Sequence, residues 1–399
     1  MQVLYLAAVF LVIILLLGIR RPLYQAIAGG LIATAILYRI PFREISGLTV
    51  NVVTKWNSLS VLVSLYLITY LQRMLEARSQ IKLAQRDLNG LFHNRRVNAA
   101  VAPLFIGLLP SAAAMILCGD IVKETTDGYL EPNEQAFITS WFRHIPESSL
   151  PTYASVLLMA NLSGVPLPTF IVGMIIPILV LFILGYIPYV KKLPRDPGTP
   201  RSLNREKDLI HLFQHLWSLL LILALILLCR MSVVPAVLVA IAAGAFVYRF
   251  QIHELLAMLI SSFEGKMLLN TFLVLVLKEF IEFTGVLELL PDVLSLLPIP
   301  LYLIFAILFF FGGLISGSNG IIALGTSLAF TAIPNGGMPL MVLLMCMCHA
   351  ASQVSPTHIC LVVAADYFHV TLGELIRKTL PRALIFCVVM VGYYQILAA

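Results

Sequence analysis

Long apolar stretches follow one another along the chain and are separated by short polar segments. An α-helix of about 20 apolar residues crosses the roughly 30 Å hydrocarbon core of a bilayer. The stretches that reach or approach this length are 2–19, 22–38, 58–72, 152–162, 168–190, 212–229, 233–248, 267–281, 338–365 and 383–398. The pattern therefore predicts an all-α polytopic membrane protein with about ten transmembrane helices.

The second half of the chain repeats landmarks of the first half at a spacing of about 206 residues. The paired landmarks are Tyr38-Arg39 with Tyr248-Arg249, YLQRMLE (70–76) with VLKEFIE (276–282), His144 with His349, and Pro151-Thr152 with Pro356-Thr357. Because each half has an odd number of predicted crossings, the second half enters the membrane upside down relative to the first. We therefore expect two inverted-topology repeats, 1–190 and 211–399, joined by a cytoplasmic linker at 191–210.

Two further apolar segments, 98–123 and 301–330, have small, polar, glycine or proline residues at their centres. If each folds back at its centre, an arm of about 12 residues is about 18 Å long and reaches only part of the way through the membrane. A full crossing by the first segment would also move the basic linker 191–210 to the outside. The sequence therefore predicts two re-entrant hairpins, one in each repeat, that enter from opposite faces.

Proline and hydroxyl residues interrupt one predicted span in each half, at 146–152 and at 352–358. Backbone groups freed at such breaks are tolerated in a membrane only where protein, water or a ligand satisfies them. We therefore expect the two breaks and the two hairpin tips to converge on a cavity near the middle of the membrane.

Composition agrees with a membrane protein and limits the alternatives, since 60% of residues are hydrophobic and 12% are charged. The first apolar stretch ends in GIRRP (18–22) without a small-residue cleavage site, so we expect a retained span and not a removed signal peptide. The six cysteines lack C-x-x-C spacing, which favours packing over metal or redox chemistry.

The net charge of +6 is explained by topology and does not require a nucleic-acid partner. If both termini lie outside, most of the 26 Lys and Arg residues fall on the cytoplasmic side, as the positive-inside rule requires. We therefore expect a multi-pass protein of a prokaryotic cytoplasmic membrane, surrounded by lipid. Arg143 is left over, because it lies in no predicted loop.

Candidate binding residues gather at the predicted hairpin tips and helix breaks. They are Pro110, Ser111, Arg143, His144, Ser149, Thr152, Ser316, Ser318, Asn319, Ser355, Thr357 and His358. Short polar side chains between glycines allow a ligand to approach the backbone closely, and an intramembrane Arg or His is costly unless it has a partner or a function. The structural alternatives are a small-residue packing patch around Ser318, an Arg143–Glu147 ion pair, and histidines that only pack between helices.

The chemistry of these positions points to ions. Helix N-termini at the breaks favour an anion, whereas freed carbonyl groups and hydroxyl groups suit Na⁺ or a proton-carrying group. The positions expected to bind Na⁺ are Ser318, Asn319, Ser355 and Thr357. We expect no tightly bound cofactor.

Three motifs carry a family resemblance: GLLP at 107–110, WFRHI at 141–145 and SPTHICLVVAADYF at 355–368. Together they resemble the ten-span bacterial and archaeal family catalogued as domain of unknown function 401, which is similar to the inverted-repeat carriers of the ion transporter superfamily. The resemblance implies a homodimeric secondary transporter. Related dicarboxylate carriers bind substrate and Na⁺ at two hairpin tips bearing Ser-Asn-Thr, and here Ser318-Asn319 is followed by Gly320, while the first tip has no asparagine.

The leading hypothesis is a carrier, not an enzyme, that moves a small organic anion by alternating access, coupled to Na⁺ or H⁺. One alternative is an intramembrane serine hydrolase that uses Ser316 or Ser318 with His349 or His358. Another is a channel. Two mirrored hairpins favour the carrier, because a hydrolase needs only one site.

Overall fold

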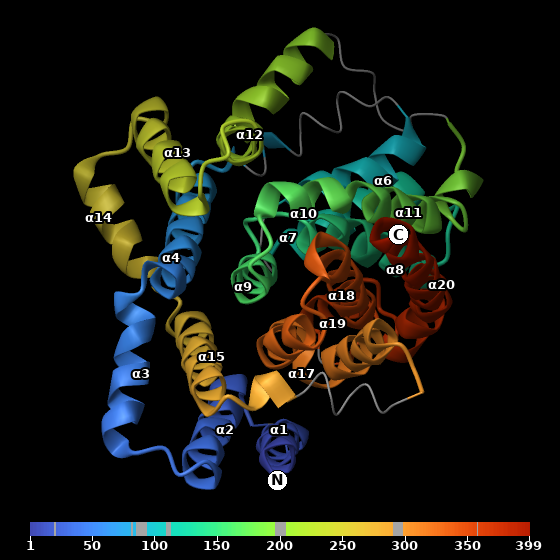
Figure 1. The fold of residues 1–399 in the computed structure, drawn as a ribbon. Coiled ribbons are helices and arrows are strands. Elements are labelled where there is room, and N and C mark those ends of the chain that lie inside the picture. The colour runs from blue at the N-terminus through green and yellow to red at the C-terminus, as the bar shows by residue number, and fades with distance from the viewer. Residues whose placement is uncertain are drawn as a thin grey trace.

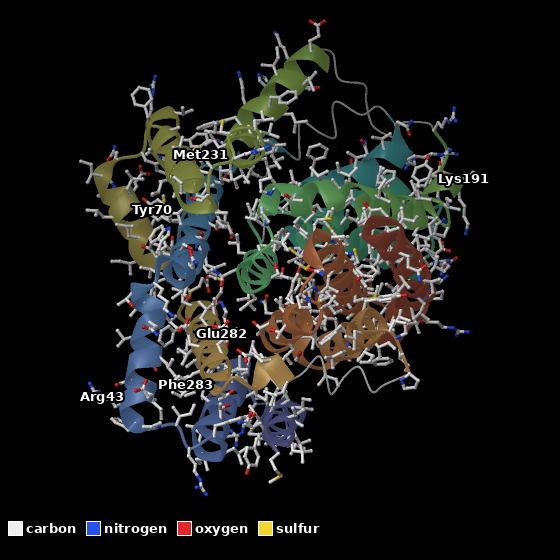
Figure 2. All side chains as sticks on the ribbon, in the orientation of Figure 1. Arg43, Tyr70, Lys191, Met231, Glu282 and Phe283 are labelled. Atoms are coloured by element: carbon white, nitrogen blue, oxygen red, sulfur yellow. The ribbon has the colours of Figure 1, made fainter. Side chains whose placement is uncertain are left out.

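The computed structural model describes residues 1–19, 21–80, 83–84, 94–108, 113–195, 205–289, 298–356 and 358–399. Within these ranges every regular element is a helix, which confirms the predicted all-α class. Large apolar side chains remain exposed over many helices, as expected for a chain surrounded by lipid. Figure 2 shows all described side chains on the ribbon.

The helices of the first half alternate with short connections. They are α1 (Gln2–Gly18), α2 (Leu23–Leu37), α3 (Phe42–Thr54), α4 (Trp56–Ala77), α6 (Arg95–Ile106), α7 (Ala113–Thr126), α8 (Pro132–His144), α9 (Ala154–Ser163), α10 (Leu167–Gly173) and α11 (Ile175–Tyr186), with 3-10 turns at Ile145–Ser148 and Val190–Lys192.

The second half has a similar order of helices. They are α12 (Arg205–Leu227), α13 (Val233–Val247), α14 (Ile252–Ser261), α15 (Gly265–Thr284), α17 (Leu301–Ala332), α18 (Gly337–Ser352), α19 (Ile359–Tyr367) and α20 (Leu372–Ala398), with a 3-10 turn at Val286–Leu289. The division into two inverted repeats stays a prediction.

The helices form two groups (Figure 1). An outer group, α1–α4 with α12–α15, curves beside an inner group, α6–α11 with α17–α20. In the outer group α15 packs on α2, α3 and α4, and α13 packs on α4. In the inner group α18 packs on α17 and α20, and α8 packs on α6, α7 and α20. Contacts of α4 with α9 and of α1 and α15 with α17 join the two groups.

Five stretches of helix in the described chain are long and apolar enough to cross a membrane. They are Trp56–Ala77, Leu167–Tyr186, Glu206–Leu227, Leu301–Ala332 and Leu372–Ala398. Six shorter apolar helices include α1, α2, α9, α13, α14 and α18. The apolar stretch 338–365, expected as one interrupted span, consists of α18 and α19 with the predicted break between them. The number of crossings remains a prediction.

Helices α3 and α14 lie outside the apolar stretches that the sequence predicted as spans. Each connects a pair of longer helices in the outer group. No residue of α14 is buried within the chain, although the helix carries Leu256 and Ile260. Two tyrosines of α4 hold it, since Tyr70 donates a hydrogen bond to the carbonyl of Leu255 (3.1 Å) and Tyr66 donates one to Leu259 (2.8 Å). Tyr70 lies beside α14 in Figure 2.

Helix α17 is broken at Gly317, within the segment predicted to form the second hairpin. Its φ of 73° and ψ of 165° are accessible essentially only to glycine. The two arms pack against each other, because a Cβ on Gly325 would meet Phe309 at 2.6 Å and Gly312 lies against the side chain of Ile321. In the first hairpin α6 and α7 pack together, whereas the tip at 109–112 lies outside the described residues. Entry of the hairpins from opposite membrane faces stays a prediction.

Candidate functional site

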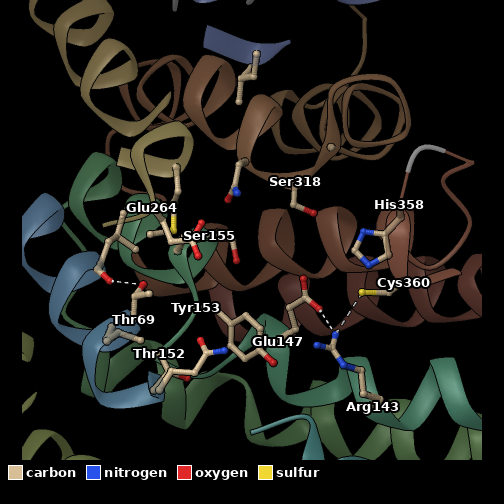
Figure 3. A pocket seen from close by; sticks show the side chains of 18 of the residues that line it. Thr69, Arg143, Glu147, Thr152, Tyr153, Ser155, Glu264, Ser318, His358 and Cys360 are labelled. Atoms are coloured by element: carbon tan, nitrogen blue, oxygen red, sulfur yellow. Dashed lines mark hydrogen bonds and ion pairs between the residues drawn. The ribbon is translucent and has the colours of Figure 1, made fainter. Parts of the chain in front are cut away.

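A cavity of about 890 Å³ lies where the inner and outer groups meet. Its walls include Thr69, Arg73, Glu76, Arg143, Glu147, Thr152, Tyr153, Ser155, Glu264, Ser316, Gly317, Ser318, Asn319, His358 and Cys360. Figure 3 shows Thr69 and Glu264 on one side, and Arg143, Glu147, His358 and Cys360 on the other.

The first helix break supplies a buried ion pair. Helix α8 ends at His144 and continues as the 3-10 turn Ile145–Ser148, and α9 begins only at Ala154. This spacing places Arg143 one turn before Glu147, with Nη1 3.3 Å from the carboxylate Oε2. The Arg143 side chain is 3% exposed and that of Glu147 is 26% exposed. The carboxylate therefore faces the cavity from beside a buried guanidinium.

The second break touches the first. Helix α18 ends at Ser352, and His358 precedes the first residue of α19. The Nε2 atom of His358 lies 3.0 Å from Nε2 of His144, and Arg143 Nη1 lies 3.8 Å from the sulfur of Cys360. Dashed lines in Figure 3 mark the contacts of Arg143 with Glu147 and Cys360. Residues more than 200 positions apart thus form one connected polar cluster.

The break at Gly317 brings Ser316, Ser318 and Asn319 to the same cavity. The Ser316 hydroxyl donates to the carbonyl of Gly312 (2.8 Å), and that of Ser318 donates to the carbonyl of Cys348 (3.4 Å). Ser355 of the second break donates to the carbonyl of Leu314 at 3.0 Å, which ties that break to the first arm of α17. The turn at Gly317 therefore sits directly against α18 and its break.

The end of α6 approaches the first break at Gly107. Tyr153 donates a hydrogen bond to the Gly107 carbonyl at 2.5 Å. A Cβ on Gly107 would overlap the backbone carbonyl of Arg143, so only glycine permits this approach. The residues next to the predicted first tip are therefore held beside the cavity.

The binding residues predicted from the sequence fall into three groups in the structure. Arg143, Thr152, Ser316, Ser318, Asn319 and His358 line the cavity. His144, Ser149 and Ser355 are buried at the two breaks, and the Ser149 hydroxyl donates to the carbonyl of Pro146 at 3.3 Å. Pro110, Ser111 and Thr357 lie outside the described residues.

The expected Na⁺ ligands are placed only in part. Ser318 and Asn319 face the cavity, Ser355 is buried against α17, and Thr357 lies outside the described residues. The Na⁺ site therefore stays a prediction.

The outer group contributes one wall of the cavity, and the sequence did not predict its residues. Arg73 of α4 pairs with Glu264 before α15 and with Glu76, each at 3.1 Å. Arg73 and Glu76 belong to the YLQRMLE landmark of the repeat, and this landmark is the sequence feature that could have marked them as candidate site residues. Glu264 has no comparable signal. Cys360 was assigned to packing, but it lines the cavity.

Comparisons with known proteins agree with this architecture. A family model described as "Protein of unknown function (DUF401)" matches residues 3–396. The YdaH transporter of Alcanivorax borkumensis is similar in structure, with a TM-score of 0.58 and 14% identity over 89% of this chain and 88% of that one. MtrF of Neisseria gonorrhoeae, described within a class of antimetabolite efflux pumps, gives a TM-score of 0.53 and 14% identity over 88% of this chain and 83% of that one. No curated protein sequence matches.

Proposed function

This chain belongs to the DUF401 family, and from that premise we propose that it is a secondary transporter that carries a small organic anion by alternating access, coupled to Na⁺ or H⁺. The family assignment confirms the resemblance of the three sequence motifs. The shared fold of two transporters supports the class of activity, while the substrate and the coupling ion rest on the cavity itself.

One observation carries the proposal: two helix breaks, one from each half of the chain, meet at a single cavity. The His144–His358 contact joins the breaks, and the Gly317 turn faces the same space. Broken helices bring backbone donors and acceptors to a ligand in the membrane without leaving them exposed to lipid. A cavity of about 890 Å³ accommodates a small metabolite.

Arg143 supports an anionic substrate. A guanidinium binds a carboxylate through two parallel hydrogen bonds, and burial strengthens such a contact. In the observed state Glu147 pairs with Arg143. We propose that the substrate carboxylate exchanges with Glu147 at Arg143, which turns the Glu147 carboxylate toward the coupling cation. Such an exchange links substrate and cation at one place.

The cavity wall also carries acidic groups, which restrict the position of the anion. Glu76 and Glu264 lie on the outer-group wall, and both pair with Arg73. Because Arg73 is shared between two carboxylates, that wall is negative as a whole and repels an anion. The substrate carboxylate is therefore expected at Arg143 on the inner group, the group that also carries the Gly317 turn.

The arrangement of hydroxyl groups favours a carrier over a hydrolase. A serine nucleophile needs a hydrogen bond to its general base. The hydroxyl groups of Ser316 and Ser318 instead donate to backbone carbonyls, and His358 faces His144. A serine-reactive probe that labelled Ser316 or Ser318 would support the hydrolase.

Counterflow in proteoliposomes tests the proposal. Purified protein is first screened by thermal shift against organic anions with and without Na⁺, because a ligand that binds the folded state raises its melting temperature. Vesicles preloaded with an unlabelled hit should then accumulate the labelled hit transiently. A channel gives no such accumulation. Stabilisation by organic cations alone would refute the anionic substrate.

A further inference from the structure

Three metal-ligating atoms meet where the two helix breaks touch. One ring nitrogen of His144, one ring nitrogen of His358 and the sulfur of Cys360 all lie within 4.8 Å of one another. From this geometry we propose that the cluster binds one divalent transition-metal ion of the Zn²⁺ class. The inference does not depend on transport activity, because it concerns a binding site that forms within a single folded chain.

The distances fit such an ion. Zn²⁺ binds histidine nitrogen at about 2.0–2.1 Å and thiolate sulfur at about 2.3 Å, so two nitrogen ligands of a tetrahedral site are roughly 3.3 Å apart. The two imidazole nitrogens are 3.0 Å apart. The Cys360 sulfur lies within 4.8 Å of a ring nitrogen of each histidine, against roughly 3.6 Å for a nitrogen–sulfur pair of a tetrahedral site, so completing the site requires the sulfur to move by at most about 1.2 Å.

The orientation of His144 supports its role as a ligand. Its Nδ1 atom lies 2.6 Å from the carbonyl oxygen of Ser140 on the preceding turn. A carbonyl oxygen can only accept, so Nδ1 of His144 carries the proton, and its Nε2 accepts a hydrogen bond from Nε2 of His358 at 3.0 Å. Metal binding then requires His358 to carry its proton on Nδ1 instead, which frees its Nε2 lone pair. A histidine ligand held by a backbone carbonyl in this way is a common arrangement around bound metals.

The donor set selects the class of ion. Two imidazole nitrogens and one sulfur suit a borderline-soft ion such as Zn²⁺, whereas Mg²⁺ and Ca²⁺ prefer oxygen ligands. Three protein ligands leave a fourth position for water or a small ligand. His358 and Cys360 both line the cavity, so that position is accessible from it.

The neighbouring charges are compatible with a bound cation. Arg143 Nη1 lies 3.8 Å from the Cys360 sulfur, but Arg143 is paired with Glu147 at 3.3 Å. The Glu147 carboxylate also lies 3.7 Å from Nε2 of His144. The ion binds Cys360 as the thiolate, so one proton passes from the thiol to solvent on binding.

The first test measures Zn²⁺ binding in detergent. Protein stripped of metal with a chelator is titrated with Zn²⁺ against a chromophoric competitor, and with Co²⁺ as a spectroscopic probe of thiolate ligation. Wild type and the control Cys387→Ser, changed at a half-buried cysteine of α20, should bind one ion per chain. Cys360→Ser and His144→Gln should each lose at least tenfold in affinity, about 1.4 kcal/mol. Equal affinity in all four proteins would overturn the proposal.

A second measurement uses wild type alone and is independent of any folding defect in the variants. Cys229 is exposed, whereas Cys360 is buried but lines the cavity, so a small maleimide that enters the cavity should alkylate Cys360 more slowly than Cys229. Zn²⁺ should slow alkylation of Cys360 at least tenfold and leave that of Cys229 unchanged, as read by mass spectrometry of the two peptides. Unchanged alkylation of Cys360 contradicts the site. Neither measurement depends on counterflow, so the metal site can be refuted while the proposed transport activity stands, and the reverse.

Discussion

Arg73 of α4 pairs with Glu264, the residue that precedes α15, at 3.1 Å. The same relationship recurs with the charges exchanged, because Glu279 of α15 pairs with Lys55, the residue that precedes α4, at 2.8 Å. Arg73 and Glu279 occupy matching places in YLQRMLE and VLKEFIE. The two ion pairs therefore join α4 and α15 at both ends of their contact, and we expect them to keep the outer group rigid during the proposed transport cycle.

The two ion pairs should differ in their contribution to stability. The Glu279 side chain is 8% exposed, so Lys55→Met removes the cation from a buried carboxylate, which keeps its contact to Asn51, and should cost about 1–3 kcal/mol. Side chains of the other pair are 37% and 50% exposed, so Glu264→Gln should cost only about 0–1 kcal/mol. Apparent melting temperatures in detergent measure the difference. Equal losses would show that burial does not set their strengths.

Close packing at Gly107 gives a second prediction. Gly107→Ala forces a methyl group into the backbone carbonyl of Arg143, which cannot move aside as a side chain could, and should destabilise the protein by about 1–3 kcal/mol. The matched control is Gly47→Ala in α3, where nothing lies within 4 Å and the helix should gain about 0.5–1 kcal/mol. Thermal unfolding of the two variants measures the predicted difference in stability. Similar melting temperatures would contradict the close approach of α6 to α8.

Topology can be tested at two exposed positions labelled in Figure 2, Arg43 and Lys191. With both termini outside, Arg43 should lie outside and Lys191 on the cytoplasmic side. In a Cys229→Ser background, a membrane-impermeant maleimide added to intact cells should label Arg43→Cys but not Lys191→Cys until the membrane is permeabilised. Labelling of Lys191→Cys in intact cells would exclude the inverted arrangement.

The sequence predicted the helix breaks because their cause is local. Proline removes a backbone donor, and hydroxyl groups compete for backbone partners, wherever the chain folds. Helix α8 was not among the predicted spans, because its sequence PNEQAFITSWFRH is too polar. Its residues from Gln135 to His144 are nevertheless all buried, since neighbouring helices enclose it and Thr139 donates to the carbonyl of Gln135.

Partners in the cavity could not be predicted because they are distant in sequence. Arg73 and Glu264 are separated by 191 positions, and His144 and His358 by 214. The repeat landmarks identify these positions in the sequence, but they do not predict which of the residues are in contact. Cys360 looked like a packing residue because His144, its neighbour in the proposed metal site, comes from the other half of the chain.

The Gly317 turn should contribute ligand groups to the substrate site. Ser318→Ala and Asn319→Ala remove side chains that line the cavity, so each should reduce the thermal shift caused by an anion found in the screen and leave the melting temperature without ligand nearly unchanged. Ser46→Ala, at an exposed hydroxyl of α3, is the control and should respond like wild type. An unchanged ligand response in both cavity variants would remove the turn from the site.

Arg143 provides the sharpest test of the anionic substrate, because lysine keeps its charge and loses its geometry. If the substrate carboxylate binds the guanidinium through two hydrogen bonds, Arg143→Lys should raise the dissociation constant at least tenfold, about 1.4 kcal/mol. Lysine can still pair with Glu147, so the melting temperature without ligand should change little. Calorimetric titration and thermal unfolding supply the two measurements.

Glu147→Gln separates this role from a purely structural ion pair. The Arg143 side chain is 3% exposed, so loss of its carboxylate partner should lower stability, by up to about 3–5 kcal/mol if the pair holds the fold. In the exchange mechanism the substrate carboxylate replaces Glu147 at Arg143, so the anion should stabilise Glu147→Gln at least as much as wild type. A large loss of stability in both variants, with unchanged anion affinity, would make Arg143 and Glu147 a structural pair and would place the substrate elsewhere in the cavity.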